Sequence, residues 1–443
     1  MIGSAAGARI SSENLSASAE ALLESACGKN ARHLIVLLAI AYVVNFLDRN
    51  DIGYAGITMN GALGLTASQF GWAAGISIVS YALLEVPSSL IMQRVGARLW
   101  LSRIMITWGI AAGLTALAVG PKSLYALRLL LGAAEAGFFP GVVLLISTWF
   151  PAHYRARMLA WFLLAIPASS VIAGPLSGLL LGMNGLLHIA GWQWMFLLQG
   201  APAVALGFVT LRVLADDPRE ARWLSSAERE VLLTTLAAER KERPRRDLVA
   251  AIKDLRVLIL TVVQFGFTLG TYGIVIWLPL MLQGHHLSPT RIGLISAPPY
   301  IVATVGMLLW ARHVDRHPNR IFHLIVTCAL AMIGLAASVL SAELLPRLLA
   351  LTVALLGVSS ARMIFWTIPP RFLAGNGAAG GIAFINSVGI LGGFFGPLLM
   401  GLLRDLTGSF TAGLLTMAAV LLVTTLAAAA LRLLAKDGDG TPQ

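Results

Sequence analysis

Charged residues are scarce in this sequence. Asp, Glu, Lys and Arg make up 12% of its 443 residues, whereas a soluble domain carries about 25%. Hydrophobic residues reach 57%, and the mean hydropathy is +0.80. This balance excludes an ordinary soluble globular protein and predicts an integral membrane protein.

Cysteine is rarer still, because Cys27 and Cys328 are the only two. They lie too far apart in sequence for a Cys-x-x-Cys metal motif and make no disulfide framework. His313 and His317 are four residues apart, a spacing that can bind zinc on a helix, but no glutamate suited to catalysis stands between them. We interpret both as surface histidines. The sequence also lacks a phosphate-binding loop and a complete nucleophile-elbow motif, so we expect no catalytic residue, metal site, cofactor or enzymatic activity.

Apolar runs fill most of the chain and are rich in Leu, Ala and Gly. A membrane-spanning helix needs about 20 apolar residues, and a β-barrel would show short alternating segments instead. Twelve long runs lie at 33–58, 70–92, 99–119, 122–148, 156–181, 193–214, 255–282, 290–311, 321–340, 345–368, 378–403 and 411–434. The expected fold class is an all-α integral membrane protein with twelve transmembrane helices in two pseudo-symmetric six-helix bundles.

One polar interval, residues 215–254, divides the runs into two groups of six. Ser225 and Glu228 form a capping-box pattern that opens an amphipathic helix there. Basic turns after the second and eighth runs indicate two related units, which in transporters enclose a site near the membrane midplane. We expect a cytoplasmic tail at 1–32, a bundle at 33–214, a linker at 215–254, a bundle at 255–435 and a tail at 436–443.

The formal net charge of +11 comes from 32 basic and 21 acidic residues. Nucleic-acid binding would explain such a charge, but the basic residues gather in the loops on one side of the expected membrane, as the positive-inside rule describes. These loops hold Arg94, Arg98, Arg103, Arg155, Arg157, Arg312, Arg316, Arg320, Arg371 and the basic run 240–246. We expect a multi-pass monomer of the cell inner (plasma) membrane, with both termini cytoplasmic and no nucleic-acid partner.

The first apolar run contains three charges, on Asp48, Arg49 and Asp51. A charge at the centre of a membrane helix costs about 2.5–3.5 kcal/mol on the lenient insertion scale. Spanning a bilayer does not require these residues, so we expect them to serve a function. Asp48 and Arg49 point about 100° apart on a helix and should face different partners.

The fourth run also contains charged residues. Arg128 and Glu135 are seven apart, so they share one face of the helix. A carboxylate near an arginine in a changing environment can bind and release a proton, and arginine is well suited to gripping a carboxylate substrate. The alternative is structural, with a fixed ion pair bracing the first and fourth spans.

Several stretches carry a family resemblance. They are Leu47-Asp48-Arg49, Glu85-Val86-Pro87-Ser88, the ten residues from Gly132 to Gly141 around Glu135, Gly191-Trp192-Gln193-Trp194, Pro299-Tyr300, Phe365-Trp366 and Asn386-Ser387-Val388-Gly389. The glutamate stretch of the fourth run and the asparagine stretch of the eleventh are the most specific. With these stretches the chain resembles the major facilitator superfamily, and within it the anion:cation symporter branch, which includes carriers of tartrate, phthalate and galactonate.

The resemblance implies proton-coupled import of an organic anion by alternating access. It associates Asp48 and Glu135 with protonation and Arg49 with the substrate or with coupling. It also implies that Arg128 pairs with Glu135 and that Asn386 lines the site.

The sequence departs from the family pattern at three positions. Phe46 replaces a common tyrosine, Asp51 stands where asparagine is common, and Ile390 stands where asparagine is frequent. Substrate contacts and proton stoichiometry therefore do not transfer from any one relative. We interpret the additional acid, Asp51, as a solvated residue near the outer vestibule.

Arg362 lies deep in the tenth run and has two open interpretations. It can snorkel toward the cytoplasmic surface, or it can face the cavity and place a second cation opposite Arg49, which suits a substrate with two acidic groups. Side chains expected to contact the substrate beside these arginines are Tyr81, Tyr272, Trp366 and Asn386.

These features favour a secondary active importer of a small organic anion, driven by protons. Sugar acids, hydroxydicarboxylates and aromatic carboxylates all fit the expected residues. The same architecture suits an exchanger, an exporter or a uniporter. A transporter-like sensor that signals through residues 215–254 is the alternative from another class. The expected partners are the organic acid, protons and the lipid bilayer.

Overall fold

The computed structural model describes residues 18–239, 254–317, 319–369 and 378–438. Twelve helices in these ranges are long and apolar enough to cross a membrane, which confirms the number of spans expected from the sequence. Four features used above lie outside the described residues: the first part of the N-terminal tail, the basic run 240–246, Arg371 and the last part of the C-terminal tail.

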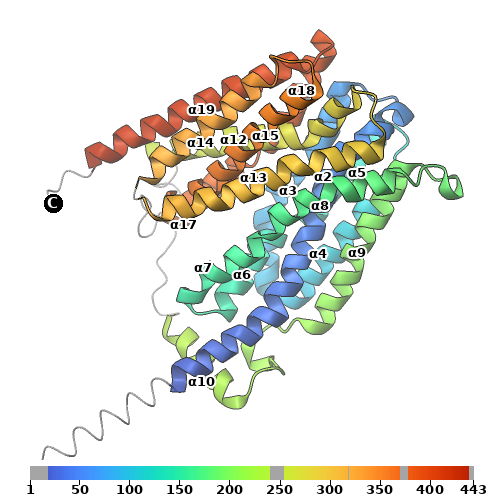
Figure 1. The fold of residues 1–443 in the computed structure, drawn as a ribbon. Helices are drawn as coiled ribbons and strands as arrows, with labels where there is room; N and C mark the ends of the chain where they lie inside the picture. The colour runs from blue at the N-terminus through green and yellow to red at the C-terminus, as the bar shows by residue number, and fades with distance from the viewer. Residues whose placement is uncertain (1–17, 240–253, 318, 370–377, 439–443) are drawn as a thin grey trace, which may run out of the picture.

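The first six spans form one bundle, in blue to green in Figure 1. They comprise a helix Ser18–Leu63, which contains the π-helical turn η1 (Ala31–Ile35) and α2 (Val36–Leu63), then α3 (Ala67–Val95), α4 (Ala97–Leu114), α5 (Pro121–Glu135) with α6 (Phe138–Trp149), α7 (Ala152–Leu163) with α8 (Ala165–Leu181), and α9 (Gly191–Val213). Short 3-10 turns lie at η2 (Thr115–Leu117), η3 (Leu186–His188) and η4 (Pro218–Glu220), before α10 (Ser226–Glu239).

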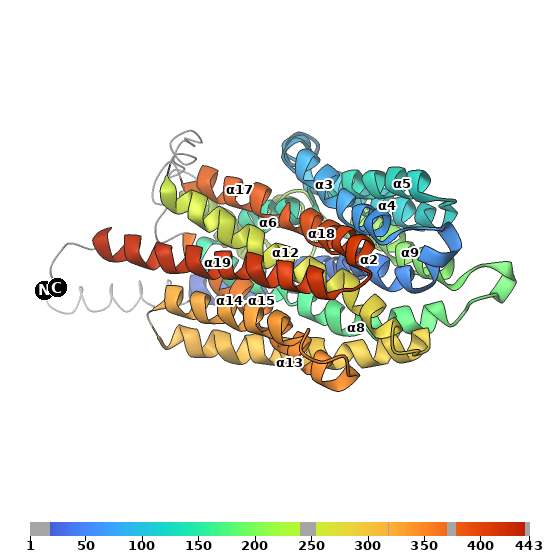
Figure 2. The same ribbon diagram turned by 90° about the horizontal axis from the view of Figure 1, so that it is seen from above.

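The last six spans form the second bundle, in yellow to red (Figure 1). They comprise α12 (Leu255–Gln283), α13 (Pro289–Asp315), α14 (Arg320–Ala337), α15 (Leu344–Phe365), α17 (Ala378–Gly389) with α18 (Gly392–Thr407), and α19 (Thr411–Gly438). Figure 2 shows the long helices of both bundles running in broadly the same direction. This is the expected arrangement of two six-helix bundles.

The fourth span is broken between α5 and α6, directly after Glu135. Gly137 adopts φ 93°, a left-handed conformation that glycine accepts without strain. The Ser88 hydroxyl of α3 donates a hydrogen bond of 2.6 Å to the carbonyl oxygen of Ala136, which the break leaves without a helical partner. The break therefore places Glu135 at a helix end in the interior of the bundle.

The first helix begins earlier than the apolar run predicts. Its described part runs from Ser18 into the first span, whereas the sequence predicts a tail up to residue 32. Its added turns pack on the segment before α10: His33 stacks on Trp223 with ring centroids 4.7 Å apart, and Lys29 pairs with Glu228 at 2.8 Å. Hydropathy alone does not detect this extension because tertiary contacts, rather than an apolar run, stabilise it.

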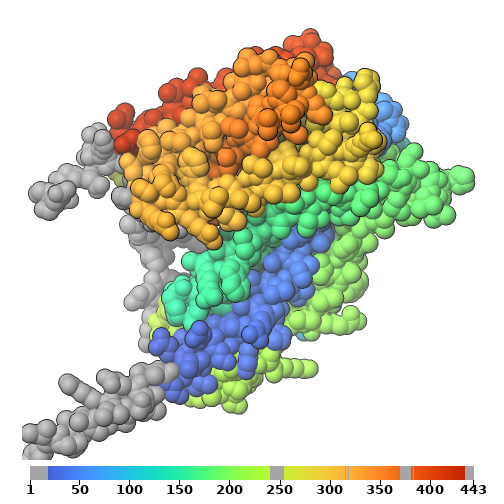
Figure 3. All heavy atoms as spheres, in the orientation of Figure 1, coloured from blue at the N-terminus to red at the C-terminus, as the bar shows by residue number. Residues whose placement is uncertain are grey.

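The two bundles meet closely at the end away from the described chain ends. α3 packs on α18 and α8 on α13, and Figure 3 shows the surface of α13 lying against that of α8. Gly174 of α8 and Gly293 of α13 bring their backbones together so closely that a side chain on either would clash. Small residues allow such close approach of membrane helices.

Hydrogen bonds reinforce this contact. At this end Tyr54 Oη lies 2.8 Å from Ser296 Oγ, the Gln283 amide donates to the carbonyl of Ile57 at 2.9 Å, and Asp405 accepts from the backbone N–H of Ser68 at 2.8 Å. We refer to this contact between the bundles, formed by α3 with α18, α8 with α13 and α2 with α12, as the outer seal, where outer means the end away from the described chain ends.

Candidate functional site

Arg49 and Glu135 form an ion pair in the interior of the first bundle. Arg49 Nε donates to Glu135 Oε2 at 2.9 Å, and the side chains are 17% and 5% exposed. The Tyr81 ring of α3 faces the guanidinium, with its centroid 4.7 Å from Arg49 Cζ. Three helices thus converge on one partly accessible cation, which is the residue type best suited to binding a carboxylate.

The expected ion pair between Arg128 and Glu135 is wrong. Arg128 Nε donates to the carbonyl of Ala73 and its Nη2 to Ser77 Oγ, both at 3.3 Å, so its guanidinium is bound to α3. Two helical turns separate Arg128 from Glu135, a rise of about 10 Å, and Glu135 turns toward α2 instead. Arg128 remains close enough to interact electrostatically with the carboxylates of the site.

Asp48 and Asp51 lie on one face of α2 and point into the bundle. Asp48 is 2% exposed and its Oδ2 accepts a hydrogen bond of 2.7 Å from Trp108 Nε1 of α4. Asp51 is 1% exposed. Gln199 of α9 lies beside Asp51, but neither carboxylate oxygen of Asp51 has a partner in hydrogen-bond geometry among the described residues.

The interpretation of Asp51 as a solvated vestibule residue is therefore wrong. Asp51 is buried because residues three apart share one face of a helix. It therefore lies on the same face of α2 as Asp48, and α4 and α9 cover this face. The two acids interact electrostatically with each other and with Arg128. We call Asp48, Asp51, Arg128, Glu135 and Arg49 the charged cluster.

The charged cluster holds three carboxylates and two guanidiniums. If all five groups were ionised, one negative charge would remain uncompensated in the interior, and isolated buried charge is costly. Binding of a single proton to one carboxylate leaves two negative charges against two positive charges. The arrangement is thus suited to exchanging one proton.

The second bundle contributes Arg362 from α15 and Tyr272 from α12. Arg362 is partly buried and interacts electrostatically with Tyr272 and with Tyr42 of the opposite bundle. Tyr272 is also an electrostatic neighbour of Arg49. These relations favour the interior reading of Arg362 over snorkelling, because its electrostatic neighbours include a buried side chain of the opposite bundle.

The other two residues expected to contact the substrate, Asn386 and Trp366, differ in their surroundings. Asn386 of α17 accepts a hydrogen bond of 3.3 Å from the Gln264 amide of α12. Trp366 follows the last residue of α15, is 37% exposed and contacts the Phe365 ring. Among the described residues, no hydrogen bond or ring contact joins Trp366 to the charged cluster or to Arg362.

Sequence reasoning overlooked Tyr42, Trp108 and Gln199. Tyr42 is buried and its ring lies 4.3 Å, centroid to centroid, from that of Phe162. A signal existed, because Tyr42, Phe46 and Arg49 follow a 4-and-3 spacing that marks one helical face. Trp108 and Gln199 carry no such signal, since only the packing of α4 and α9 on α2 brings them to the acids.

Comparisons with known proteins found a matching family model and similar relatives. The family model described as the Major Facilitator Superfamily matches residues 38–382. A candidate tartrate transporter of Agrobacterium vitis is 46% identical over 92% of this chain and 94% of its own. A quinolone resistance transporter of Acinetobacter baumannii is 42% identical over 88% and 91%.

A solved structure shares the fold. It is the bacterial homolog of the human lysosomal transporter Spinster in an inward-facing and occupied conformation, with a TM-score of 0.74 at 17% identity over 91% of this chain and 97% of its own. At that identity the likeness concerns the arrangement of helices alone.

Proposed function

This chain belongs to the major facilitator superfamily of membrane transporters, and on that premise we propose that it moves a small organic anion together with protons by alternating access. The observation that carries the proposal is the Arg49–Glu135 ion pair, 2.9 Å long and partly accessible. The name of the Agrobacterium vitis relative, a candidate tartrate transporter, supports the same substrate class.

The ion pair acts as an exchange site. In the empty state the Glu135 carboxylate is paired with the Arg49 guanidinium. A proton on Glu135 removes its charge, and the planar fork of Arg49 then becomes available for the carboxylate of the substrate. Proton and anion therefore bind together, and each favours the other. Asp48, Asp51 and Arg128 surround the pair and adjust the balance of charge as the proton moves.

Arg362 supplies the second anchor. It lies in the bundle opposite Arg49, and Tyr42 and Tyr272 are electrostatic neighbours of both arginines. A substrate with two carboxylates would bridge the bundles, and its hydroxyls would bind Tyr81, Tyr272 and Asn386. This favours a hydroxydicarboxylate over an aromatic monocarboxylate. Trp366 contributes only if the bundles move, because its contacts lie at the end of α15.

The outer seal gives the direction of opening. If the basic loops and both termini face the cytoplasm of the cell, as the positive-inside rule predicts, the sealed end faces outward and the molecule is inward-facing. In this reading residues 33–214 and 255–435 are the two bundles that rock about the site, in the inner membrane, with 215–254 as the cytoplasmic linker.

Transport by purified protein in liposomes tests the proposal. A panel of labelled sugar acids, hydroxydicarboxylates and aromatic carboxylates is offered with and without an inward proton gradient. We expect gradient-stimulated uptake of a hydroxydicarboxylate such as tartrate. Arg49→Lys should lower it at least tenfold, since lysine cannot form a bidentate pair. Glu135→Gln should abolish the stimulation by the gradient.

Matched variants control for charge removal alone. Arg291→Lys and Glu343→Gln change the same residue types at exposed helix starts and should transport normally. Uptake that ignores the gradient in the native protein would refute proton coupling.

The Acinetobacter baumannii relative favours a second candidate, export of an amphipathic drug. Liposomes preloaded with a quinolone and energised by an inward proton gradient separate the two. Drug efflux without organic-acid uptake would establish the exporter.

A further inference from the structure

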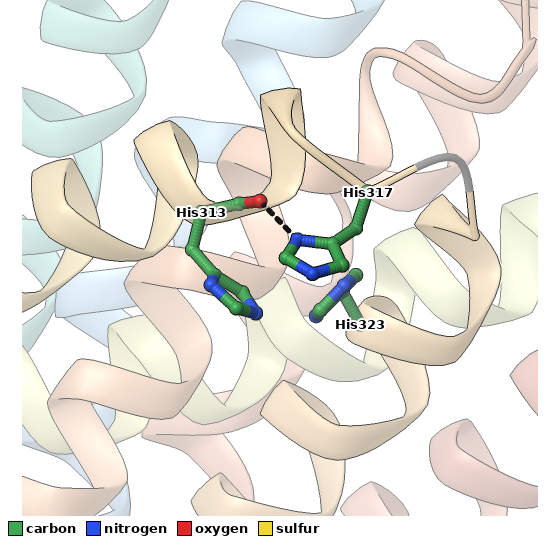
Figure 4. A group of neighbouring side chains, drawn as sticks. All are labelled: His313, His317 and His323. Atoms are coloured by element: carbon green, nitrogen blue, oxygen red, sulfur yellow. Dashed lines mark hydrogen bonds between the residues drawn. The ribbon is translucent and has the colours of Figure 1, made fainter.

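Three histidines converge between α13 and α14, at the end opposite to the outer seal. His313 lies in the last turn of α13, His317 follows the helix, and His323 lies in the first turns of α14. One ring nitrogen of each lies within 4.8 Å of those of the other two. Figure 4 shows the three imidazoles turned toward one common space. From this geometry we propose that His313, His317 and His323 bind a Zn²⁺ ion.

The tautomer of His317 is suited to a ligand. Its Nδ1 lies 2.8 Å from the carbonyl oxygen of His313, so Nδ1 carries the hydrogen and Nε2 keeps its lone pair. Figure 4 shows this second nitrogen facing the other two rings. Histidines that bind metals commonly donate their other N–H to a backbone carbonyl, which fixes the orientation of the ring.

His323 adds a buried histidine to the two exposed ones. This side chain is 7% exposed, and its ring lies 5.7 Å from that of Phe322 and 6.5 Å from that of Trp310, centroid to centroid. His313 and His317 are exposed. The site therefore has an apolar wall on one side and access for the ion from the other.

The distances permit coordination with a small movement. Zinc binds imidazole nitrogen at about 2.0–2.1 Å, so tetrahedral ligands lie about 3.3 Å apart. The nitrogens must approach one another by at most about 1.5 Å, which rotation of the two exposed side chains allows. Three histidines with water in the fourth position is an established arrangement for zinc, and imidazole suits Zn²⁺ rather than Mg²⁺ or Ca²⁺.

The surrounding charge has two opposing parts. The site lies at the C-terminal end of α13, where the helix dipole favours a cation. Arg312 and Arg316 are exposed nearby and oppose it. Their charges extend into solvent, which screens them, and neutral imidazole ligands do not depend on the field. The arginines lower the affinity without removing the site.

The ion would join two helices that otherwise contact each other little. Both α13 and α14 pack on α15, while α13 also packs on α8 and α14 on α19, and α13 and α14 have few direct contacts with each other. Bound zinc would therefore hold the end of α13 to the start of α14 and stabilise the second bundle.

Zinc titration of the full chain, purified without a histidine tag and stripped of metal, tests the proposal. We expect calorimetry to give one Zn²⁺ per chain and a higher melting temperature with zinc. His317→Ala changes an exposed residue and should fold normally, yet it should weaken zinc binding more than tenfold and remove the thermal shift. His323→Ala should do the same.

Two further measurements complete the test. The double variant His285→Ala with His286→Ala removes two histidines of another loop and should bind zinc like the native chain. Co²⁺ in place of Zn²⁺ should show the intense visible bands of a tetrahedral site, lost in His317→Ala. Failure to bind one Zn²⁺ per chain, or equal binding by His317→Ala, would overturn the proposal.

Discussion

Asp48 depends on a single indole for its hydrogen bond. Trp108 is fully buried and donates to Oδ2, while Oδ1 has no partner among the described residues. Hydrogen bonds to charged groups contribute about 1.5–3 kcal/mol, and losing one in the interior leaves an acceptor unsatisfied. Trp108 therefore fixes the orientation of the Asp48 carboxylate.

Trp108→Phe removes this bond and keeps most of the ring. We expect a clear loss of thermal stability in detergent, of about 1.5–3 kcal/mol, and slower transport. Trp194→Phe is the matched control, because Trp194 donates to Leu186 in an exposed loop, and it should change stability by less than about 0.5 kcal/mol. Equal melting temperatures for both variants would contradict this role for Trp108.

At the residue scale, the sequence indicated which groups matter better than it indicated their partners. Asp48, Arg49 and Glu135 stand out because charge inside an apolar run has a cost. Helical spacing suggested that Arg128 should meet Glu135, but spacing says only that two residues share a face. The break at Gly137 and the packing of α2 decide that Arg49 is the partner.

Helix α8 contacts α13 through glycine, and this contact is part of the outer seal. An added Cβ at Gly174 would lie 2.5 Å from the carbonyl oxygen of Gly293, closer than real contacts permit. An alanine there must push the bundles apart at this end.

Gly174→Ala should therefore weaken the outer seal and favour the opposite conformation. A cysteine introduced at Ser296 reports the change, since it should react faster with an impermeant thiol reagent in the Gly174→Ala background. Gly113→Ala is the control, because its added Cβ meets open space in α4. Alanine should stabilise the helix by about 0.5–1 kcal/mol relative to glycine and leave the outer seal unchanged. Unchanged reactivity with Gly174→Ala would argue against a seal made by this contact.

Helix α10 is attached to the first helix through Glu228. Hydrogen bonds from Lys29 and Ser25, and from the backbone N–H of Ser225, hold the pKa of the Glu228 carboxyl at about 2, below its ordinary 4.5. A carboxyl whose pKa is lower in the folded state stabilises the fold above pH 4.5. That contribution is lost as the pH falls from 4.5 toward 2.

Glu228→Gln should accordingly lower the melting temperature at pH 7, and its difference from the native chain should shrink between pH 4.5 and 2. Differential scanning fluorimetry across this range measures both. Glu230→Gln, two residues away and exposed, should follow the native curve. A constant difference at every pH would show that the contact acts through packing rather than charge.

At the scale of elements, apolar runs predicted the spans but not their interruptions. The breaks between α5 and α6 and between α7 and α8 fall inside continuous apolar stretches. Pro175 and Pro397 lie inside α8 and α18, which continue through them. Neighbouring helices satisfy the freed backbone groups in a membrane protein, and a single sequence does not show which neighbours they are.

At the scale of the whole molecule, the charged residues of the interior are divided between the two bundles. The first holds the charged cluster, with three acids and two bases, and the second places Arg362 across the interface. Helix count and the division into halves followed from the sequence, because both depend on hydropathy and charge. The relation between Arg362, Tyr272 and Tyr42 did not, because it depends on how one bundle sits on the other.

Proton uptake on substrate binding tests the account most directly. The purified transporter in weakly buffered detergent solution is mixed with the organic anion identified by the liposome panel, tartrate first, and a pH indicator follows the protons taken up. If the anion displaces Glu135 from Arg49, as proposed above, about one proton should be taken up per anion bound, and none in Glu135→Gln even where that variant binds the anion. Binding by the native chain without proton uptake, or equal uptake by Glu135→Gln, would contradict the exchange at this ion pair.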